Sequence, residues 1–473
     1  MLKNVSPCRG RLSGLVPTAA ALVVVLSGCS FIPVYERPAA PVPASLDSGS
    51  AAAATASDPT AVAAEMAWRD FVQDARLREL IALAIENNRD LRLATLNIEQ
   101  VRAQYQIQRA AQFPTVNAGA TASRQSSGDD TITNAYTAGL TMSGWEIDFF
   151  GRIASLKEAA LAQYLASEAS RNSAQTSLVA AVASSWLSLQ TSDELLALTQ
   201  QTLKTRQESL RLTQLRFDSG VSSALDLRQA ESLLASAQGT LAQQQRQRAL
   251  DVNALTLLAG QSVPPSMLPT TGTSSQQFSA VPVGLSSEVL IQRADIRAAE
   301  QQLIAANANI GAARAAFFPR ISLTASLGTA SDELSGLFKS GSWGFTLAPQ
   351  ALLPVFDAGR NRAGLQVAQA QRDIAVVQYE KAIQTAFREV SDALAGRATL
   401  VRQGEALRAQ ADAESERFRL AELRYRNGIA SFLDVLDAQR SLFATQQALS
   451  QILLAQRQNQ VALYKALGGG WKD

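Results

Sequence analysis

The sequence predicts an α+β protein that combines four β-strands of membrane-spanning length with long α-helices, in two internal structural repeats. Three observations carry this prediction. Two runs without proline, residues 152–217 and 360–425, are rich in Ala, Leu, Gln, Arg and Glu, which are strong helix formers. Four shorter segments alternate apolar and small polar residues with period two, as strands do. Matching motifs also recur along the chain at a nearly constant offset, as an internal duplication requires.

The N-terminus has the layout of a secretory signal peptide. Three basic residues precede an apolar run at 15–26, which is too short for a stable bilayer span, and small residues then precede Cys29. The sequence Leu-Ser-Gly-Cys that ends this stretch resembles a lipobox, where bacterial signal peptidases leave a lipid-modified cysteine. We therefore expect a signal peptide at 1–28 and a lipid on Cys29; the alternative is an ordinary signal with a chance cysteine. By resemblance to bacterial lipoprotein sorting, Ser30 in place of aspartate favours the outer membrane.

The composition argues against several classes of function. The chain has 43 Lys and Arg against 41 Asp and Glu, and removal of residues 1–28 with their three basic groups leaves 40 against 41. This near-neutral balance predicts no nucleic-acid partner. The chain has no histidine, and Cys8 would leave with the signal, so the mature chain lacks disulfides and the commonest metal ligand and general base. We predict no enzyme activity, no cofactor and no metal site.

Internal repeats organise the rest of the chain. The motif at 109–114 returns at 314–319 with an offset of 205, and Gly151-Arg152 returns as Gly359-Arg360 with an offset of 208. The offset of 208 also relates the motif at 215–220 to 423–428, Leu225-Asp226 to Leu433-Asp434, and Ala259-Gly260 to Leu467-Gly468. Because there are only two copies, we interpret this as one duplicated unit rather than a solenoid array.

Each repeat reads as a helix, a hairpin, a long helix, a turn and a return helix. The long helices are those at 152–217 and 360–425, and the shorter helical runs lie at 77–113, 226–259, 288–318 and 433–467. At 1.5 Å per residue a long helix reaches roughly 100 Å, and two short runs placed end to end match it. This predicts a long bundle of two continuous and two stacked helices. A cytosolic coiled-coil rod is the alternative, which the signal peptide disfavours.

The alternating segments begin after Pro114 and Pro319, which end helices. Alternation covers 116–123, 136–143, 321–328 and 343–348, with one apolar face and one face of small hydroxyl and glycine residues. Strands of about 10 residues cross a tilted path through a bilayer. A soluble, half-buried hairpin is the alternative, but the lack of charges on the second face suits a water-filled lumen. Four strands cannot close a barrel. If the strands span the membrane, several subunits must therefore contribute strands to one barrel, as a dimer, a trimer or a larger ring.

The turns between long and return helices contain Gly220 and Gly428, and glycine there allows a left-handed helix cap. Just beyond the second turn, Asp437 and Arg440 are three residues apart and share a helix face. An exposed intrahelical ion pair is a sufficient explanation for them. In a ring of subunits, however, each carboxylate is repeated around the axis, and the carboxylates repel unless a neighbour's arginine or a cation offsets them.

Taken together, these parts resemble the TolC-like outer-membrane factors, in particular the OprM-type, NodT-like lipoprotein subunits of tripartite RND drug-efflux pumps. The motifs that carry the resemblance are Leu26–Cys29 with Pro33, Tyr35, Arg37 and Pro38, the Phe-Pro breaks at 113–114 and 318–319, Trp145–Arg152 and Leu433–Arg440. They occur in order along nearly the whole chain.

The resemblance implies a homotrimer with a twelve-stranded transmembrane β-barrel continuous with a long periplasmic α-helical barrel. It implies a passive exit duct, anchored through Cys29 in outer-membrane lipid, that joins an inner-membrane RND transporter through a periplasmic adaptor. The expected domains are a signal at 1–28, a lipidated and equatorial segment at 29–75, repeat 1 at 76–260 with strands at about 115–148, an equatorial linker at 261–287, repeat 2 at 288–468 with strands at about 320–357, and a tail at 469–473.

The resemblance also implies roles for individual residues. Asp434 and Asp437 match aspartates that form a periplasmic constriction, Arg440 an arginine that ties it shut, Leu433 an apolar layer of the gate, and Tyr425 a tyrosine of its hydrogen-bond set; Asp226, the duplicate of Asp434, would add a weaker contribution. A second arginine of the family's gate falls on Ala430 here, which puts that link in doubt. Gly220, Val221, Gly428 and Ile429 match the tips that dock the adaptor.

Amphiphilic antibiotics, dyes or detergents are the expected cargo, with selection made mainly upstream. An outer-membrane duct for type I protein secretion has the same architecture and stays a candidate. Metal export is disfavoured, because the mature chain has three methionines and no histidine. A lipid-anchored structural coiled coil would need the helices but not the alternating strands.

Overall fold

The computed structural model describes residues 30–43, 66–126, 128, 132–269, 277–281 and 287–471; the expected signal peptide and Cys29 lie outside them. The chain forms two compact units. Unit 1 comprises Met1–Pro38, Glu99–Ala166 and Ala299–Tyr379, and unit 2 comprises Ala39–Ile98, Ser167–Ala298 and Glu380–Asp473. Each unit takes segments from both repeats, so the compact units do not follow the sequence duplication.

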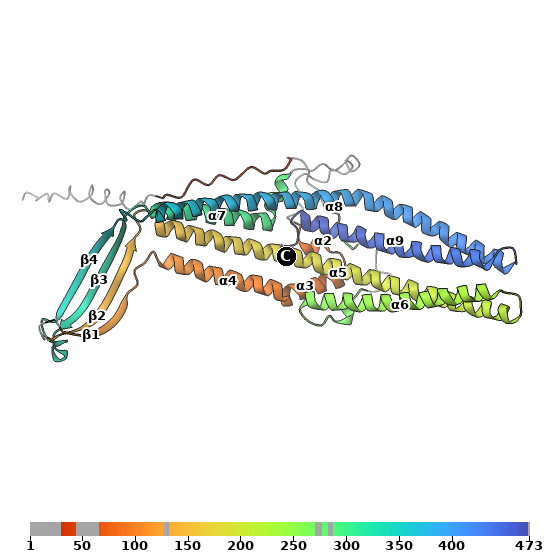
Figure 1. Cartoon of the computed structure of the whole chain (residues 1–473), viewed down its shortest axis with the longest axis horizontal. Coiled ribbons are helices and arrows are strands. Elements are labelled where there is room, and N and C mark those ends of the chain that lie inside the picture. The colour runs from red at the N-terminus through yellow and green to blue at the C-terminus, as the bar shows by residue number, and fades with distance from the viewer. Residues whose placement is uncertain are drawn as a thin grey trace, which may run out of the picture. The chain divides into compact units, whose positions relative to one another are not determined.

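A four-stranded antiparallel sheet belongs to unit 1 (Figure 1). Its strands are β1 (Asn117–Ser126), β2 (Ile132–Ile147), β3 (Arg320–Ser331) and β4 (Trp343–Leu352), in the order β1-β2-β3-β4. The pairing of β2 with β3 joins the two repeats, while β1 and β4 form the edges of this sheet. The strands extend beyond the alternating segments that predicted them: β1 continues to Ser126, β2 begins at Ile132 and β3 continues to Ser331.

The register confirms that the sheet has one apolar and one small polar face. Leu140 lies opposite Leu327, which lies opposite Phe345, so these three side chains share a face. The neighbouring row on the other face is glycine from all four strands, namely Gly119, Gly139, Gly328 and Gly344. Residues directly opposite each other in a sheet point to the same side, so the two chemistries stay separated in these middle rows of all four strands.

A β-bulge between Met142 and Trp145 maintains this separation at the base of β2. Gly144 in the bulge has a φ of 64°, and its N–H donates to Thr324 Oγ1 over 3.1 Å. The extra residue places Trp145 opposite Leu323 on the apolar face. Glu146 consequently lies on the small polar face, where its carboxylate accepts hydrogen bonds from Arg152 and Arg320 at 2.7 to 3.1 Å.

The predicted long and return helices are confirmed. They are α5 (Arg152–Asp218), α6 (Ala224–Ala259), α8 (Arg360–Arg426) and α9 (Phe432–Ala466); the shorter elements are α2 (Trp68–Phe71), α3 (Ala75–Asn87), α4 (Arg89–Ala110), α7 (Ala294–Ala315), η2 (Pro265–Met267), η3 (Ser287–Gln292) and η4 (Leu334–Gly336). Among the described residues, no helix combines the length and the apolar character needed to cross a membrane.

The single helical run expected at 77–113 is wrong, because the chain breaks it at Asn88. This residue has an extended ψ of 131°, its Nδ2 donates to the Leu258 carbonyl over 2.9 Å, and its Oδ1 accepts from the Leu91 N–H. The side chain thus caps α4 and binds α6 at once. The run expected at 288–318 is divided in the same way, since η3 precedes α7.

The main core of unit 2 surrounds a group of buried aromatic rings. Tyr464 of α9 stacks on Phe71 with ring centroids 3.9 Å apart, and its hydroxyl donates to the Met66 carbonyl over 2.8 Å. Trp68 and Trp186 are fully buried beside them. Val72 and Phe278 form an isolated bridge, so the expected equatorial segment and equatorial linker both contribute to this core.

In unit 1, the N-terminal segment 30–38 lies along α7. The ring of Phe31 stacks on Phe318 at 4.7 Å, and Asn307 Nδ2 donates to the Pro33 carbonyl over 2.8 Å. Glu300 accepts hydrogen bonds from the Tyr35 hydroxyl and from Arg37, the latter through both carboxylate oxygens. Contacts at both ends of α7 therefore hold the segment in an extended conformation.

Candidate functional site

The two turns that join α5 to α6 and α8 to α9, hereafter the hairpin tips, have the same backbone structure. Gly220 and Gly428 adopt left-handed φ values of 73° and 74°. The N–H of Val221 donates to the Arg216 carbonyl over 2.8 Å, and the N–H of Ile429 to the Arg424 carbonyl over 2.9 Å. Each tip is thus a Schellman motif, and the left-handed glycine cap expected from the sequence is confirmed.

Both return helices begin with a capping box. The Ser223 hydroxyl accepts the Asp226 N–H while Asp226 accepts the Ser223 N–H, and Ser431 and Asp434 do the same in α9. Asp434 and Asp226 therefore each have a structural task that the sequence pattern Ser-x-x-Asp could have revealed. Burial acts to raise the pKa of Asp226, but the hydrogen bonds from Ser223 and Ser222 outweigh it and lower that pKa below its ordinary value.

Tyr425 lies in the small apolar core behind the tips. Its ring is tilted against Phe432 at 5.2 Å, and the Arg216 guanidinium lies 4.4 Å from the ring centroid. Val435 and Leu233 bury their side chains in the same cluster. Tyr425 therefore joins the arms of both hairpins, whereas Leu433 remains more than half exposed on α9.

Asp437 does not pair with Arg440, its neighbour on the helix face, but with Arg417 of α8. Arg417 also donates to Glu414 Oε2 over 3.1 Å and to the Ser441 hydroxyl over 3.4 Å. Arg417 was not among the residues predicted from the sequence. The signal was available, because Arg417 precedes Gly428 by nearly as many residues as Asp437 follows it, and a tight hairpin brings such positions together.

Arg440 is exposed, and among the described residues no hydrogen bond or ion pair joins it to a carboxylate. A second arginine lies close behind it. Arg206 of α5 is only 4% exposed, donates to the Leu233 carbonyl over 2.8 Å and lies 5.4 Å from the Phe443 ring. Burial and the positive charge of Arg440 both lower the pKa of Arg206, so the two guanidinium groups repel each other.

The outer surface of the tips is apolar where the docking residues lie. Val221 is 76% and Ile429 69% exposed, although the position after a Schellman glycine often packs back onto its helix. A groove of about 310 Å³ lies beside them between α5, α8 and α9. It is lined by apolar and aromatic side chains, by neutral polar ones, and by the charged residues Lys204, Glu208, Arg216, Glu422 and Arg426.

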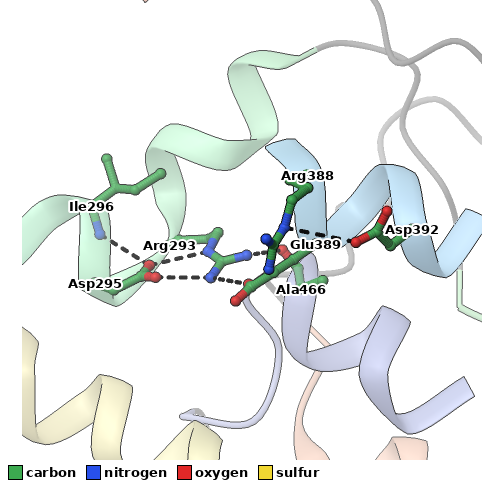
Figure 2. A network of polar contacts seen from close by, with 7 residues as sticks. All are labelled: Arg293, Asp295, Ile296, Arg388, Glu389, Asp392 and Ala466. Carbon is green, nitrogen blue, oxygen red and sulfur yellow. Dashed lines mark hydrogen bonds and ion pairs between the residues drawn. The ribbon is translucent and has the colours of Figure 1, made fainter. Parts of the chain in front are cut away.

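A second polar network lies far along the sequence from the tips, in unit 2 (Figure 2). Arg293 is 5% exposed and donates to Asp295 at 2.8 and 3.0 Å, to Glu389 at 2.7 Å and to the Ala466 carbonyl at 2.7 Å. The guanidinium thereby ties α7, α8 and the end of α9 together. Burial alone would lower the pKa of Arg293, but its two carboxylate partners outweigh burial and raise it.

The described residues contain no group of three or more His, Cys, Asp or Glu side chains that could hold a metal ion. The acidic residues singled out from the sequence are instead engaged in helix caps and in ion pairs with arginine. The arrangement is one of polar and charged groups at helix termini, in which hydroxyls and carboxylates cap the helices.

The fold and the duplication define the class of protein. A model of the family described as "Outer membrane efflux protein" matches the chain twice, at residues 80–261 and 285–469, once for each repeat. The chain therefore belongs to the outer membrane efflux protein family.

The chain is also similar to individual members of this family over nearly its whole length. The probable efflux pump outer membrane protein TtgC of Pseudomonas putida is 48% identical over 461 residues, covering 96% of this chain and 95% of that protein. The outer membrane protein OprJ of Pseudomonas aeruginosa is 45% identical over 464 residues and 96% of each chain. The open state of the Neisseria gonorrhoeae MtrE outer membrane channel is similar with a TM-score of 0.86 at 42% identity, covering 94% of this chain and 99% of that one.

These similarities confirm the resemblance to the TolC and OprM type, the α+β fold with two internal repeats, and the expectation of an outer-membrane efflux protein. They do not reach the individual gate, docking and lipidation residues, which stay predictions.

Proposed function

We propose that the chain forms the exit duct of a tripartite drug-efflux system, as a homotrimer that shares one barrel of twelve strands. The observation that carries this proposal is the sheet of unit 1, whose strands β1 and β4 lie at its edges. In hydrocarbon, an edge leaves backbone N–H and C=O groups without partners, at several kcal/mol each. Three copies of four strands pair every edge and give a barrel in the size range of membrane barrels.

The two faces of the sheet fit this arrangement. The row that contains Leu140, Leu327 and Phe345 offers an apolar surface to lipid. The middle of the opposite face is mainly glycine, serine and threonine, such as Thr121 and Thr137, whose hydroxyls lie 2.6 Å apart. The charged residues of this face, Glu146 and Arg320, lie near the strand ends and pair with each other, so the middle of the lumen wall has no charged group to select cargo and the choice of substrate falls to the partners of the duct.

We propose that the charged residues near the second tip form the periplasmic gate. Asp434 and Asp437 lie on the first two turns of α9, with Leu433 exposed beside them and Arg440 one turn on. Trimer formation brings three copies of each carboxylate toward one axis, where arginine from a neighbouring copy lowers their repulsion. Tyr425 fixes the arm that carries them, and Asp226 places its carboxylate at the equivalent turn of α6.

The proposed partners are a periplasmic adaptor and an inner-membrane RND transporter. The exposed apolar side chains of Val221 and Ile429, together with Gly220 and Gly428, supply a docking surface beside the 310 Å³ groove. Its mixture of apolar, aromatic and charged lining residues suits an amphipathic helical hairpin. No nucleic acid enters this proposal.

The cargo is proposed to be amphiphilic small molecules. Relatives that are 46% to 48% identical to this chain are named as outer membrane proteins of antibiotic, solvent and toluene efflux pumps. This resemblance favours drug efflux over type I protein secretion, which has the same architecture. The sheet, with its exposed apolar side chains, disfavours a lipid-anchored structural rod.

Lipidation of Cys29 completes the proposal. Segment 30–38 follows Cys29 directly, and the Phe31 ring stacks on Phe318, one residue before the Pro319 that precedes β3. A lipid on Cys29 would therefore start close to the end of the sheet in unit 1. This position suits an anchor in the leaflet that the strands enter.

Reconstitution tests the whole proposal. Full-length protein purified in detergent is expected to give a trimer by native mass spectrometry, with a diacylated and N-acylated Cys29, and to form pores in planar bilayers. Asp437→Asn and Arg440→Gln are expected to raise the open probability. A stable monomer that never inserts into liposomes would refute the shared barrel, and unchanged conductance in both variants would refute the gate.

A further inference from the structure

The second hairpin tip has a further arginine, Arg417, in addition to the proposed gate residue Arg440. Asp437 is held by Arg417, which belongs to the other arm of the same hairpin, although Arg440 is the nearer residue in sequence. We propose that Arg417 is a positioning residue of the gate: it holds Asp437 on its own protomer and thereby competes with the closing contact between Asp437 and Arg440 of a neighbouring copy. This inference rests on the proposed gate.

Arg417 has hydrogen-bond partners other than Asp437, so it is not left unpaired when Asp437 leaves. Its Nη1 donates to Glu414 Oε2 over 3.1 Å, and the same nitrogen lies 3.4 Å from the Ser441 hydroxyl. Glu414 is three residues earlier on α8, so this bond is independent of what α9 does. When Asp437 leaves, Arg417 keeps a counter-charge and stays in place to take the carboxylate back.

Arg440 is available to bind a carboxylate of another protomer. It is exposed and, within the described part of the chain, forms no ion pair, while the positive charge of the buried Arg206 acts against it. An exposed guanidinium without a carboxylate partner remains a strong hydrogen-bond donor. The surface that it offers is therefore complementary to an aspartate of another protomer.

The first repeat shows that a helical hairpin does not need these charges. At the offset of 208, the positions of Glu414, Arg417, Asp437 and Arg440 correspond to Arg206, Ser209, Gln229 and Ser232. The first tip nevertheless has the same Schellman turn and the same capping box. The charged set is thus an addition to the second hairpin and is separable from its fold.

The strength of the pair also fits an exchangeable contact. The side chains of Arg417 and Asp437 are 47% and 53% exposed. Exposed ion pairs are individually weak, because water and salt screen them and both side chains lose freedom. A neighbour can therefore capture Asp437 without first breaking a strong bond, and the balance between the two arginines sets the fraction of closed channels.

The test compares single-channel open probability of the reconstituted trimer among matched variants. Arg417→Gln is expected to lower the open probability, by about two- to fivefold if the pair has the strength of an exposed ion pair. Arg440→Gln and Asp437→Asn are expected to raise it. Arg417→Lys is expected to restore wild-type behaviour, and Arg419→Gln, which breaks only the neighbouring pair with Glu416, to leave it unchanged.

The outcomes separate the inference from the proposed gate. If Arg440→Gln and Asp437→Asn change nothing, the gate itself fails and the inference with it. If these two variants open the channel but Arg417→Gln leaves the open probability unchanged, or raises it, only the competition is overturned. Each variant is first checked as a folded trimer by native mass spectrometry, and the double variant of Arg417 and Arg440 is expected to behave as Arg440→Gln alone.

Discussion

Gly220 and Gly428 occupy the same left-handed position in two Schellman turns, 208 residues apart, with φ values of 73° and 74°. Around them the duplication has retained the backbone and changed the chemistry. Arg216 and Arg424 each provide the carbonyl that accepts the last N–H of the turn. The residues that face the opposite arm, however, are charged in the second hairpin and largely neutral in the first. Backbone geometry and gate chemistry are therefore encoded by different positions.

Replacing Gly428 by alanine tests the backbone requirement. A Cβ at Gly428 meets no atom within 4 Å, so the substitution acts only through the left-handed φ. We expect a loss of about 1 kcal/mol or more, because an L-residue pays roughly 1–2 kcal/mol in this region. Chemical denaturation of the detergent-solubilised trimer, followed by circular dichroism, measures the change.

Gly239→Ala is the matched control, since Gly239 lies inside α6 and also has open space around it. In a helix interior, alanine is more favourable than glycine by about 0.5–1 kcal/mol, so this variant is expected to gain stability. The same sign of change in both variants would contradict the role of the left-handed turn.

Ser431 allows the cap of α9 to be separated from its charge. Ser431→Ala removes the hydroxyl that accepts the Asp434 N–H, and an N-cap of this kind contributes about 1 kcal/mol. Amide exchange in the first turn of α9 is therefore expected to become several-fold faster. Hydrogen–deuterium exchange measures it, with Ser431→Thr as the control that keeps a hydroxyl.

Asp434→Asn makes the complementary change, because it removes the charge and keeps an acceptor oxygen near the Ser431 N–H. If Asp434 belongs to the gate, Asp434→Asn changes conductance while Ser431→Ala mainly changes exchange. Conductance that responds to both variants equally would assign Asp434 to the cap alone.

Much of the fold could be predicted from the sequence because its signals are local. The long helices follow from 66-residue runs without proline, and the strand faces follow from strict alternation after Pro114 and Pro319. Asn88 could not be predicted as a helix break, because its extended backbone depends on a carbonyl of α6 that is 170 residues away. The β-bulge before Trp145 was likewise not predicted, although Gly144, with its left-handed φ, is a residue typical of such a bulge.

The site was predicted less completely because its contacts cross between helices. Asp434 and Asp437 were found by their resemblance to family motifs, but their partners were not. Arg417 reaches Asp437 only through the hairpin, and Arg293 meets Glu389 across 96 residues of chain. Periodicity within one helix cannot reveal such pairs. The nearly equal sequence separations of Arg417 and Asp437 from Gly428, however, could have indicated that pair.

Gly311 on α7 provides a test of how segment 30–38 is held. A Cβ there would lie 2.6 Å from Ser155 Oγ, 2.7 Å from Ile32 Cγ1 and 2.9 Å from the Ile32 nitrogen. Gly311→Ala is therefore expected to displace the segment, at about 1–3 kcal/mol for overpacking. A glutamyl endopeptidase cleaves after Glu36, and we expect this cleavage to become at least several-fold faster.

Gly364→Ala is the control, because Gly364 of α8 also lies in unit 1 and has no atom within 4 Å of an added Cβ. Its cleavage rate at Glu36 is expected to match wild type. Equal rates in the Gly311 variant would mean that the segment adapts without leaving α7.

The Arg293 network of Figure 2 predicts a specific dependence of stability on pH. Burial acts to raise the pKa of Asp295, but the hydrogen bonds and charge of Arg293 outweigh it and lower that pKa below its ordinary value. The unfolded state, with an Asp pKa of about 3.9, then binds more protons near pH 4 than the folded state does. The stabilisation from this carboxylate is therefore complete above about pH 5, and it is lost as the pH falls through the lowered pKa of the folded state.

Thermal unfolding between pH 7 and pH 3 measures this loss of stability. Asp295→Asn is expected to be less stable than wild type at pH 7 and to lose less stability on acidification. Asp392→Asn, which removes only the exposed partner of Arg388 at 3.7 Å, is expected to keep the wild-type slope. Parallel pH profiles for wild type and Asp295→Asn would show that the Arg293 network does not depend on the ionised form of Asp295.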